Sequence, residues 1–241
     1  MENGSSTTEC GIVYMVIGNS ENYIKEFKRS YFSLRKFYKG GVTLITNSDI
    51  SLEGVDVISV DCENLDWFRM VLNKPKYLKL SPYKKTIFLD SDTLIIEDFS
   101  EMFDILSHFD FCATLSPMDY AWPRVGGKKM IGYLPHNTGV IGFNCNSKCM
   151  DVFEDWYSLY EERINLELSG NDQTPFMESL YKNQASICTL PFNYNLRTNF
   201  PGNLVAGKVC ILHDRTLPQK FVNSINESLE IRLIEKSKYI K

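Results

Sequence analysis

Short apolar runs alternate with helix-spaced segments through the first part of the chain. Residues 11–17 read G-I-V-Y-M-V-I, which is typical of a buried strand, and residues 20–38 then carry apolar side chains at helical spacing. Two β-branched runs follow at 42–46 and 55–60, and a second helical pattern at 66–80 leads into another apolar strand. This alternation predicts an α/β chain with a mostly parallel central sheet of the nucleotide-binding type, flanked by helices.

The rest of the chain continues this pattern around one long irregular segment. Further helices are expected at residues 99–108, 148–168 and 172–181, and further strands at 111–115 and 138–143. Residues 117–135 are rich in Gly, Pro and aromatic side chains, and a loop of that length is uncommon unless it binds something. No repeat or linker divides the sequence, so residues 1–241 are expected to form one domain, with 1–10 as a flexible leader and 221–241 as a C-terminal extension.

Composition narrows the class of protein. Of the 241 residues, 44% are hydrophobic, which supplies enough apolar surface for a sizeable core. The net charge of -4 and the lack of a long basic run argue against nucleic acid as a partner. No run approaches the length of a membrane span, and the polar N-terminus lacks the features of a secretory signal, so a cytoplasmic protein is expected. Seven cysteines without a C-x-x-C pair fit buried thiols in a reducing compartment.

An acidic doublet, Asp90 and Asp92, closes an apolar run that reads T-I-F-L-D-S-D. Side chains i and i+2 of an extended chain project from the same face, so the two carboxylates can direct oxygens to one point. In open α/β sheets, ligands collect at the carboxyl ends of strands. Two carboxylates there suit magnesium or manganese better than zinc, which favours nitrogen and sulfur. The doublet also suits a turn or the cap of the following helix, because Asp is common in both.

Five motifs give the sequence a family resemblance. They are F-L-D-S-D-T-L at 88–94, an A-x-x-W-P-like loop at 121–123, N-T-G-V-I-G-F at 137–143, N-D-Q at 171–173 and L-P-F-N-Y-N-L at 190–196. In this order they resemble the glycogenin-like retaining glycosyltransferases of family 8, which have the GT-A fold, over about residues 11–220. The resemblance implies a hexosyltransferase that uses a UDP-sugar donor.

The resemblance assigns the acidic doublet to a metal site. In such enzymes the D-x-D carboxylates hold manganese against the donor's diphosphate, so Asp90 and Asp92 are expected to bind Mn2+, with Mg2+ as the alternative ion. A distant histidine is usually the third ligand, and His213 in V-C-I-L-H-D matches it, since imidazole can complete an oxygen-dominated site. Without the resemblance, a strand-end histidine that is satisfied by backbone groups is the simpler interpretation. His108 and His136 are expected at an exposed helix end and in a loop.

A further set of residues is expected to bind the donor. The resemblance places this set at Gly18, Asn19, Ser20, Tyr23, Lys74, Ser91, Asn137, Thr138, Gly139, Asp172, Gln173 and Lys220. Gly18 lets backbone approach a nucleotide closely, and the helix start beside it adds a favourable dipole, although an ordinary turn, an N-cap and a core Tyr23 explain the same residues. Asn137 and Thr138 both donate and accept hydrogen bonds, which suits sugar hydroxyls, and they also fit a turn into a strand.

Catalytic roles are implied for Lys74, Asp172 and Gln173. Positive charge from the metal, Lys74 and Lys220 stabilises a departing diphosphate, although Lys74 also fits solvated surface. The resemblance places Asp172 at the donor sugar's hydroxyls, and a simple helix N-cap explains the same residue. Gln173 is placed opposite the leaving group, and because it is a poor nucleophile, front-side attack is favoured over double displacement.

Two departures from the family pattern limit the carry-over of these roles. After His213 the chain has Thr216 where glycine is expected, and it places Lys220 one position late. Residues 197–204 read R-T-N-F-P-G-N-L and lack the tyrosine that receives glucose in self-glucosylating members of the family. The acceptor is therefore expected to be a separate glycan or small molecule.

Two other classes of function stay open at this point. The sequence D-S-D-T-L resembles the D-x-D-x-T signature of haloacid-dehalogenase-type phosphohydrolases, but Leu94 stands where its threonine belongs. A catalytically silent nucleotide-sugar-binding protein of the same fold is the other alternative. The intact set of Asp90, Asp92 and His213 argues against a silent protein.

Overall fold

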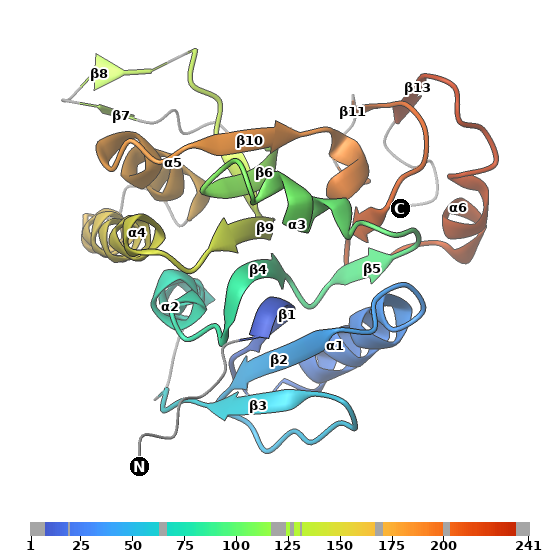
Figure 1. Cartoon of the computed structure of the whole chain (residues 1–241), viewed down its shortest axis with the longest axis horizontal. Helices are drawn as coiled ribbons and strands as arrows, with labels where there is room; N and C mark the ends of the chain where they lie inside the picture. The colour runs from blue at the N-terminus through green and yellow to red at the C-terminus, as the bar shows by residue number, and fades with distance from the viewer. Residues whose placement is uncertain are drawn as a thin grey trace.

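The computed structural model describes residues 8–18, 20–62, 67–116, 124–125, 128–130, 132–166, 171–199 and 203–234. Within these residues a seven-stranded sheet forms the centre, with the strand order β10-β6-β9-β4-β1-β2-β3 (Figure 1). Its strands are β1 (Thr8–Val16), β2 (Gly41–Thr46), β3 (Asp56–Ser59), β4 (Tyr83–Leu89), β6 (Phe111–Leu115), β9 (His136–Asn144) and β10 (Ile187–Leu190). Strand β9 runs antiparallel to β4 and β6, and the other neighbours pair in parallel. The predicted mostly parallel α/β sheet is confirmed, and the arrangement is consistent with a GT-A fold.

Helices cover both faces of this sheet. They are α1 (Glu21–Leu34), α2 (Trp67–Leu78), α3 (Glu101–Ile105), α4 (Ser147–Asn165) and α5 (Gln173–Lys182). Alternate side chains of β1 divide between two cores, since Ile12 and Tyr14 pack with α1 and α3 while Val13 packs with α2, α4 and α5. Figure 1 shows this second group of helices together on the left. None of the described helices combines the length and the apolar character needed to cross a membrane.

The order of the strands reverses between β1 and β4. From β1 the chain passes through α1 to β2 and β3 on one side, and β4 then pairs with the other side of β1. In open α/β sheets a crevice forms at such a point, outside the carboxyl ends of the strands. Asp90 and Asp92 follow directly after β4, so this topology places the acidic doublet at the mouth of the crevice.

A smaller unit of short elements packs on the right of the sheet in Figure 1. It contains β5 (Thr93–Ile95) paired with β12 (Ile211–His213), β11 (Asn203–Val205) paired with β13 (Arg232–Ile234), the 3-10 helix η1 (Phe192–Tyr194) and α6 (Gln219–Ser224). Its core consists of Leu196, Val205, Val209, Leu212, Ile225 and Ile234. An apolar strand ending at His213 was predicted, and β12 confirms it. The other short strands of this unit were not predicted, because three-residue strands carry no readable periodicity. The pairing of β5 with β12 brings the segment of His213 beside the acidic doublet.

Two expected boundaries differ from the structure. Residues 8–10, expected within the leader, begin β1 because Thr8 and Cys10 pair with Tyr83 and Lys85 of β4. Residues 221–234, expected within a C-terminal extension, belong to the smaller unit, whose core they help to bury. Within the expected loop at 117–135, the described part includes the two-residue strands β7 (Arg124–Val125) and β8 (Lys128–Lys129), and most of 117–127 lies outside the described residues.

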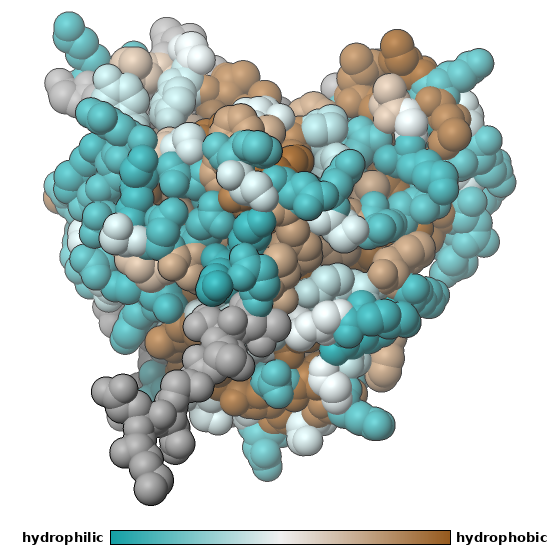
Figure 2. Space-filling view, viewed as in Figure 1, coloured by the Kyte–Doolittle hydropathy of each residue, from teal (hydrophilic) through white to brown (hydrophobic). Residues whose placement is uncertain are grey.

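Exposed aliphatic side chains gather over the β11–β13 pair. Leu204 and Leu233 lie opposite each other and are 57% and 60% exposed, whereas their strand neighbours Val205 and Ile234 are buried in the smaller core. This alternation is the ordinary consequence of a two-stranded sheet that is covered on one face. Figure 2 shows the uncovered face as an apolar area at the upper right.

Candidate metal and donor site

A cavity of about 600 Å3 opens at the carboxyl ends of β1 and β4. Of the residues named from the sequence, it is lined by Tyr23, Lys74, Asp90, Ser91, Asp92, Asn137, Thr138, Gly139, Asp172, Gln173 and His213. Gly18, Ser20 and Lys220 are described but do not line it, and Asn19 lies outside the described residues. The apolar side chains of Met15 and Met70 also line the cavity. Most of the predicted site residues therefore meet in one place, while their roles stay predictions.

Residues 90–93 form a turn after β4, as one sequence interpretation expected, but the carboxylates of Asp90 and Asp92 face the cavity and do not cap a helix. The turn after β4 is closed by Thr93, whose backbone N and Oγ1 both donate to the backbone oxygen of Asp90, at 3.2 and 2.8 Å. At the start of α3, the side chain of Asp98 accepts from the backbone N of Ser100, at 2.9 Å. Local structure therefore uses other groups, which leaves both carboxylates of the doublet for interactions within the cavity.

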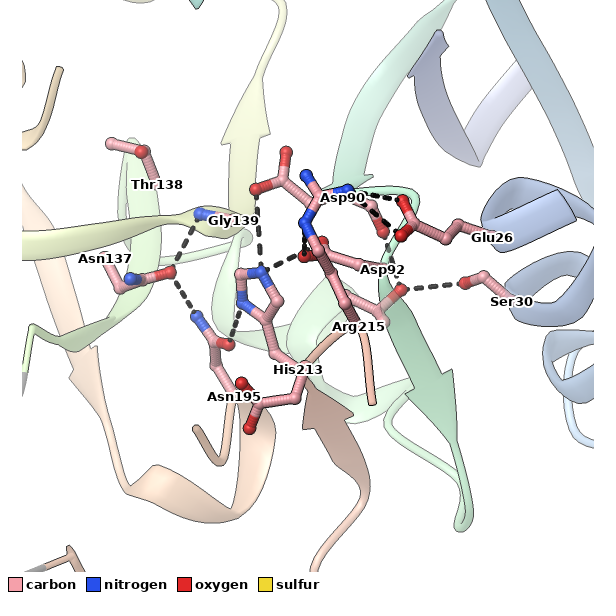
Figure 3. Close-up of polar contacts among 12 residues, drawn as sticks. Glu26, Ser30, Asp90, Asp92, Asn137, Thr138, Gly139, Asn195, His213 and Arg215 are labelled. Atoms are coloured by element: carbon pink, nitrogen blue, oxygen red, sulfur yellow. Dashed lines mark hydrogen bonds and ion pairs between the residues drawn. The ribbon is translucent and has the colours of Figure 1, made fainter. Parts of the chain in front are cut away.

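His213 meets both carboxylates, as Figure 3 shows. Its Nε2 lies 3.1 Å from Asp92 Oδ1 and 3.7 Å from Asp90 Oδ2. Each of the three residues offers a ligand atom within 4.8 Å of the others. Two carboxylate oxygens and one imidazole nitrogen form a donor set that suits a divalent ion such as manganese. Among the described residues, this buried Asp-Asp-His group can therefore hold a divalent metal.

A chain of side-chain hydrogen bonds fixes the orientation of the His213 ring. Asn137 Oδ1 accepts from the backbone N of Gly139 at 2.9 Å and from Asn195 Nδ2 at 2.7 Å. Asn195 therefore turns its Oδ1 toward His213 Nδ1, 2.8 Å away, and this oxygen can only accept. The network thus assigns the ring hydrogen to Nδ1, and in the neutral ring the Nε2 lone pair points at the carboxylates. Two acceptors 3.1 Å apart need a proton or a cation between them, so the geometry fits a metal ligand.

Gly139 is required by the close packing of this group. A Cβ atom at this position would overlap the His213 ring and would lie 2.8 Å from Asp90 Oδ2. The backbone oxygen of Gly139 also accepts from the backbone N of Asp90 at 2.8 Å, which ties β9 to the end of β4. The N-T-G segment was expected to contact the donor sugar, and the structure adds that its glycine makes room for the candidate metal ligands.

The charges around the doublet keep Asp92 ionised. Burial by itself would raise the pKa of Asp92, but His213, when its Nε2 carries a proton, and Arg215 hold that pKa below its ordinary value. Arg215 Nε lies 3.9 Å from Asp92 Oδ2. A carboxylate that stays charged is the form a metal ligand requires.

Lys74 joins the doublet to a third carboxylate. Its Nζ lies 3.1 Å from Asp90 Oδ1 and 3.6 Å from Asp172 Oδ2, and its side chain is only 7% exposed. Burial lowers the pKa of Lys74, but Asp90 and Asp172 outweigh this effect and raise the pKa above its usual value. Thr138 completes the cluster, since its Oγ1 donates to Asp172 Oδ2 at 2.8 Å and its backbone oxygen accepts from Lys74 Nζ at 3.2 Å. Lys74 is therefore a buried cation and not solvated surface.

Asp172 and Gln173 stand at the start of α5. Asp172 occupies the N-cap position, but its side chain makes no capping hydrogen bond and turns to Lys74 and Thr138 instead. The backbone N of Gln173 is satisfied by Asn171 Oδ1 at 2.8 Å. Gln173 Oε1 is buried and has no hydrogen-bond partner among the described residues, so it is an acceptor at the cavity wall. The carboxylate of Asp172 therefore does not cap α5.

The first strand-to-helix turn is tied to β2 rather than open to the cavity. Gly18 has φ +94, its N donates to Asn47 Oδ1 at 2.8 Å, and its oxygen accepts from Ser48 Oγ at 2.9 Å. Ser20 precedes α1 without making a side-chain capping bond. Tyr23 lines the cavity, and the guanidinium of Arg215 lies 5.1 Å from the centre of its ring. Of this predicted group, the structure brings only Tyr23 into the cavity among the residues it describes.

The other two histidines are not both where the sequence placed them. His108 is exposed just after α3, as expected. His136 was expected in a loop, and that was wrong: it begins β9, is 4% exposed, and lies 2.9 Å from Thr189 Oγ1 through its Nε2. Pairing of Leu115 with His136 across β6 and β9 extends the strand past the apolar run that marked it in the sequence.

Sequence reasoning missed three residues that shape the site. Asn195 orients His213, and it lies in the L-P-F-N-Y-N-L motif, which was noted only as a family marker. Arg215 stands two residues after His213, just beyond the end of β12, and this short spacing was the only sequence signal for it. Arg29 of α1 donates to the backbone oxygens of Asp214 and Arg215 at 3.1 and 3.0 Å, and no local pattern signals this role.

Comparison with known proteins relates the chain to a glycogenin. A glycogenin from Komagataella phaffii is 26% identical to the chain over 141 residues, which is 58% of this chain and 31% of the relative. The chain thus matches less than a third of that relative's length. No protein-family model matches the chain. The similarity suggests a glycogenin-like glycosyltransferase, and membership of family 8 stays a prediction.

Proposed function

We propose that this chain is a manganese-dependent retaining glycosyltransferase of family 8, which moves a hexose from a UDP-sugar to a hydroxyl of a glycan or small molecule. In this proposal the described elements form one catalytic domain. Magnesium is the alternative ion. The similarity to a glycogenin supports the reaction class, and the chemistry of the cavity supports the use of a metal.

One observation carries the proposal: the convergence of Asp90, Asp92 and His213. The doublet and the histidine lie far apart in the sequence, and the β5–β12 pair brings them together at the point where the strand order reverses. A nucleotide ligand is expected at that edge of an open α/β sheet. A divalent ion held there would neutralise negative charge on a donor's diphosphate as the sugar leaves.

The buried cluster of Lys74, Asp90, Thr138 and Asp172 prepares the cavity for the donor sugar. Lys74 holds the carboxylates of Asp90 and Asp172 on either side of its ammonium group. Asp172 has further acceptor capacity, because a carboxylate can accept more hydrogen bonds than the two that these contacts use. We assign Asp172 to the hydroxyls of the donor sugar and Lys74 to the positioning of both carboxylates.

Gln173 supports front-side attack by the acceptor. A double displacement needs a nucleophile on the face of the sugar opposite the leaving group, and a neutral amide is a poor one. The Oε1 of Gln173, which no described residue contacts by a hydrogen bond, can instead accept a hydrogen bond from a sugar hydroxyl. The incoming hydroxyl would then enter on the side of the leaving diphosphate, which retains the configuration at the anomeric carbon.

The test is release of UDP from UDP-glucose, UDP-galactose and UDP-N-acetylglucosamine in the presence of Mn2+. We expect the wild type to hydrolyse one of these donors slowly, and Asp92→Asn to abolish this hydrolysis. The control is Asp151→Asn, at an exposed position of α4, which should leave the hydrolysis unchanged. Binding without turnover would instead support the silent nucleotide-sugar-binding protein. Release of phosphate from a generic monoester would favour the phosphohydrolase, and the absence of both binding and turnover would reject the proposal.

A further inference from the structure

Two cations at the cavity differ in how strongly the protein holds them. Lys74 is buried, and its charge is offset by Asp90 and Asp172 at 3.1 and 3.6 Å. Arg215 stands at the rim, where its side chain is 53% exposed. An anionic ligand would have to break a buried ion pair to recruit Lys74, but only a partly solvated contact to recruit Arg215.

The side chain of Arg215 already lies close to Asp92, one of the candidate metal ligands. Its Nη1 donates to both oxygens of Glu26 at 3.0 and 3.1 Å, and its Nε lies 3.9 Å from Asp92 Oδ2. The guanidinium also lies over the Tyr23 ring, and the backbone oxygen of Arg215 accepts a hydrogen bond from Arg29. The main chain of Arg215 is therefore anchored while its planar group is held by side chains of α1, as Figure 3 shows for Glu26.

We propose, resting on the proposed function, that Arg215 binds the diphosphate of the donor and that Glu26 holds its guanidinium in place until the nucleotide arrives. Carboxylate and phosphate present similar pairs of oxygens to the fork of an arginine, so one can replace the other with little movement. A diphosphate attached to an ion at Asp90, Asp92 and His213 lies beside Asp92, which the Arg215 side chain already approaches. Glu26 then competes with the ligand for Arg215.

This assignment differs from the one the sequence suggested. Lys220 was expected to contact the diphosphate, but it is exposed in α6 and does not line the cavity. Arg215 follows His213 by two residues. It precedes Pro218, the residue at which the chain enters α6. The cation nearest the candidate metal ligands in this part of the chain is therefore Arg215.

The test measures binding of uridine, UMP and UDP in the presence of Mn2+ to the full chain and four variants. Arg215→Ala is expected to weaken UDP binding roughly 10- to 100-fold, the range for a hydrogen bond to a charged group, and to leave uridine binding unchanged. Arg215→Lys should recover only part of the loss, because it lacks the fork. Lys220→Ala should match the wild type. Glu26→Gln should strengthen UDP binding, because it removes the competing charge.

Three results would overturn the inference. Equal losses of uridine and UDP binding in Arg215→Ala would show a structural role, and a loss confined to Lys220→Ala would return the diphosphate to that lysine. Weaker UDP binding in Glu26→Gln would exclude competition for Arg215. If the wild type binds neither UDP nor uridine with Mn2+, the proposed function itself fails and this inference fails with it, a pattern distinct from the other three.

Discussion

The two ends of the cavity contain similar ion pairs in opposite surroundings. The inner cluster consists of Lys74, Asp90, Thr138 and Asp172, and its Lys74–Asp90 pair is 3.1 Å long. The outer cluster consists of Tyr23, Glu26 and Arg215, and its Arg215–Glu26 pair is 3.0 Å long. Side-chain exposure is 7% for Lys74 and 53% for Arg215. Similar distances therefore join cations that differ greatly in their access to water, whereas the carboxylates of Asp90 and Glu26 are 29% and 14% exposed.

Burial decides what each cluster can do. Removing one partner of a buried pair leaves an uncompensated charge, whereas an exposed pair is replaced by water at little cost. The inner cluster is therefore suited to hold a fixed geometry, and the outer cluster is suited to change partners when an anion arrives. The following predictions test this distinction, beginning with the largest effect.

Replacing Lys74 should cause the largest loss of stability. Lys74→Ala leaves Asp90 and Asp172 close together without their shared cation, and should lower the free energy of unfolding by about 3–5 kcal/mol. Urea unfolding measures this change. Lys79→Ala is the matched control, since Lys79 forms a pair with Glu154 that is 31% and 66% exposed. Equal losses in the two variants would show that burial does not distinguish these pairs.

His136 extends the comparison to a buried group that has no carboxylate partner in the part of the chain that the structure describes. Lys74 keeps its charge beside two carboxylates, whereas burial alone lowers the pKa of His136 to about 4. The unfolded chain binds a proton at His136 below about pH 6.5, but the fold excludes it until about pH 4. The free energy of unfolding should therefore fall by about 3 kcal/mol as the pH drops through this window, with no contribution above it.

The pH dependence can be assigned to His136 by difference. His136→Gln keeps a polar group near Thr189 but removes the titration, so its loss of stability between pH 6.5 and pH 4 should be smaller than that of the wild type. His108→Gln, at an exposed position, should follow the wild-type curve. Parallel curves for the wild type and His136→Gln would show that His136 takes up its proton in the folded state at an ordinary pH.

Arg29 contacts the main chain beside the outer cluster and beside the acidic doublet, and its replacement should have an intermediate effect. It donates to the backbone oxygens of Asp214 and Arg215 and reaches that of Asp92 at 3.4 Å, so it ties together both segments that carry the candidate metal ligands. Arg29→Ala should lower the free energy of unfolding by about 1.5–3 kcal/mol, the range for hydrogen bonds to a charged group. It should also weaken Mn2+ binding, because the two segments lose their common support.

A second arginine separates these two effects. Arg35 also donates to backbone oxygens, but those of Gly40 and Gly54 lie in segments that carry no candidate metal ligand. Arg35→Ala should therefore lower stability by a similar amount and leave Mn2+ binding unchanged. If both variants lose Mn2+ affinity equally, the loss reflects general destabilisation rather than the position of Arg29.

The sequence predicted what depends on local spacing and missed what depends on tertiary contacts. Asp90 and Asp92 could be found because two carboxylates close to the end of a buried strand stand where ligands collect, although residues 91–92 form a turn and not the extended chain that was assumed. The longer alternating elements up to α5 follow from periodicity. His213 required a family resemblance, since only the β5–β12 pair brings it to the doublet. Asn195 and Arg29 act through partners distant in the sequence, which no local pattern reveals.

The outer pair should give the smallest change in stability, although we expect the same variant to have a large effect on UDP binding. Arg215→Ala should lower the free energy of unfolding by only about 0–1 kcal/mol, because the lost pair is partly solvated. In 1 M salt the screening length falls to about 3 Å, so wild type and variant should become still more alike. Urea unfolding at low and high salt measures both values. A loss as large as that of Lys74→Ala would mean that the rim is as firmly fixed as the interior, and that Arg215 cannot exchange Glu26 for a ligand.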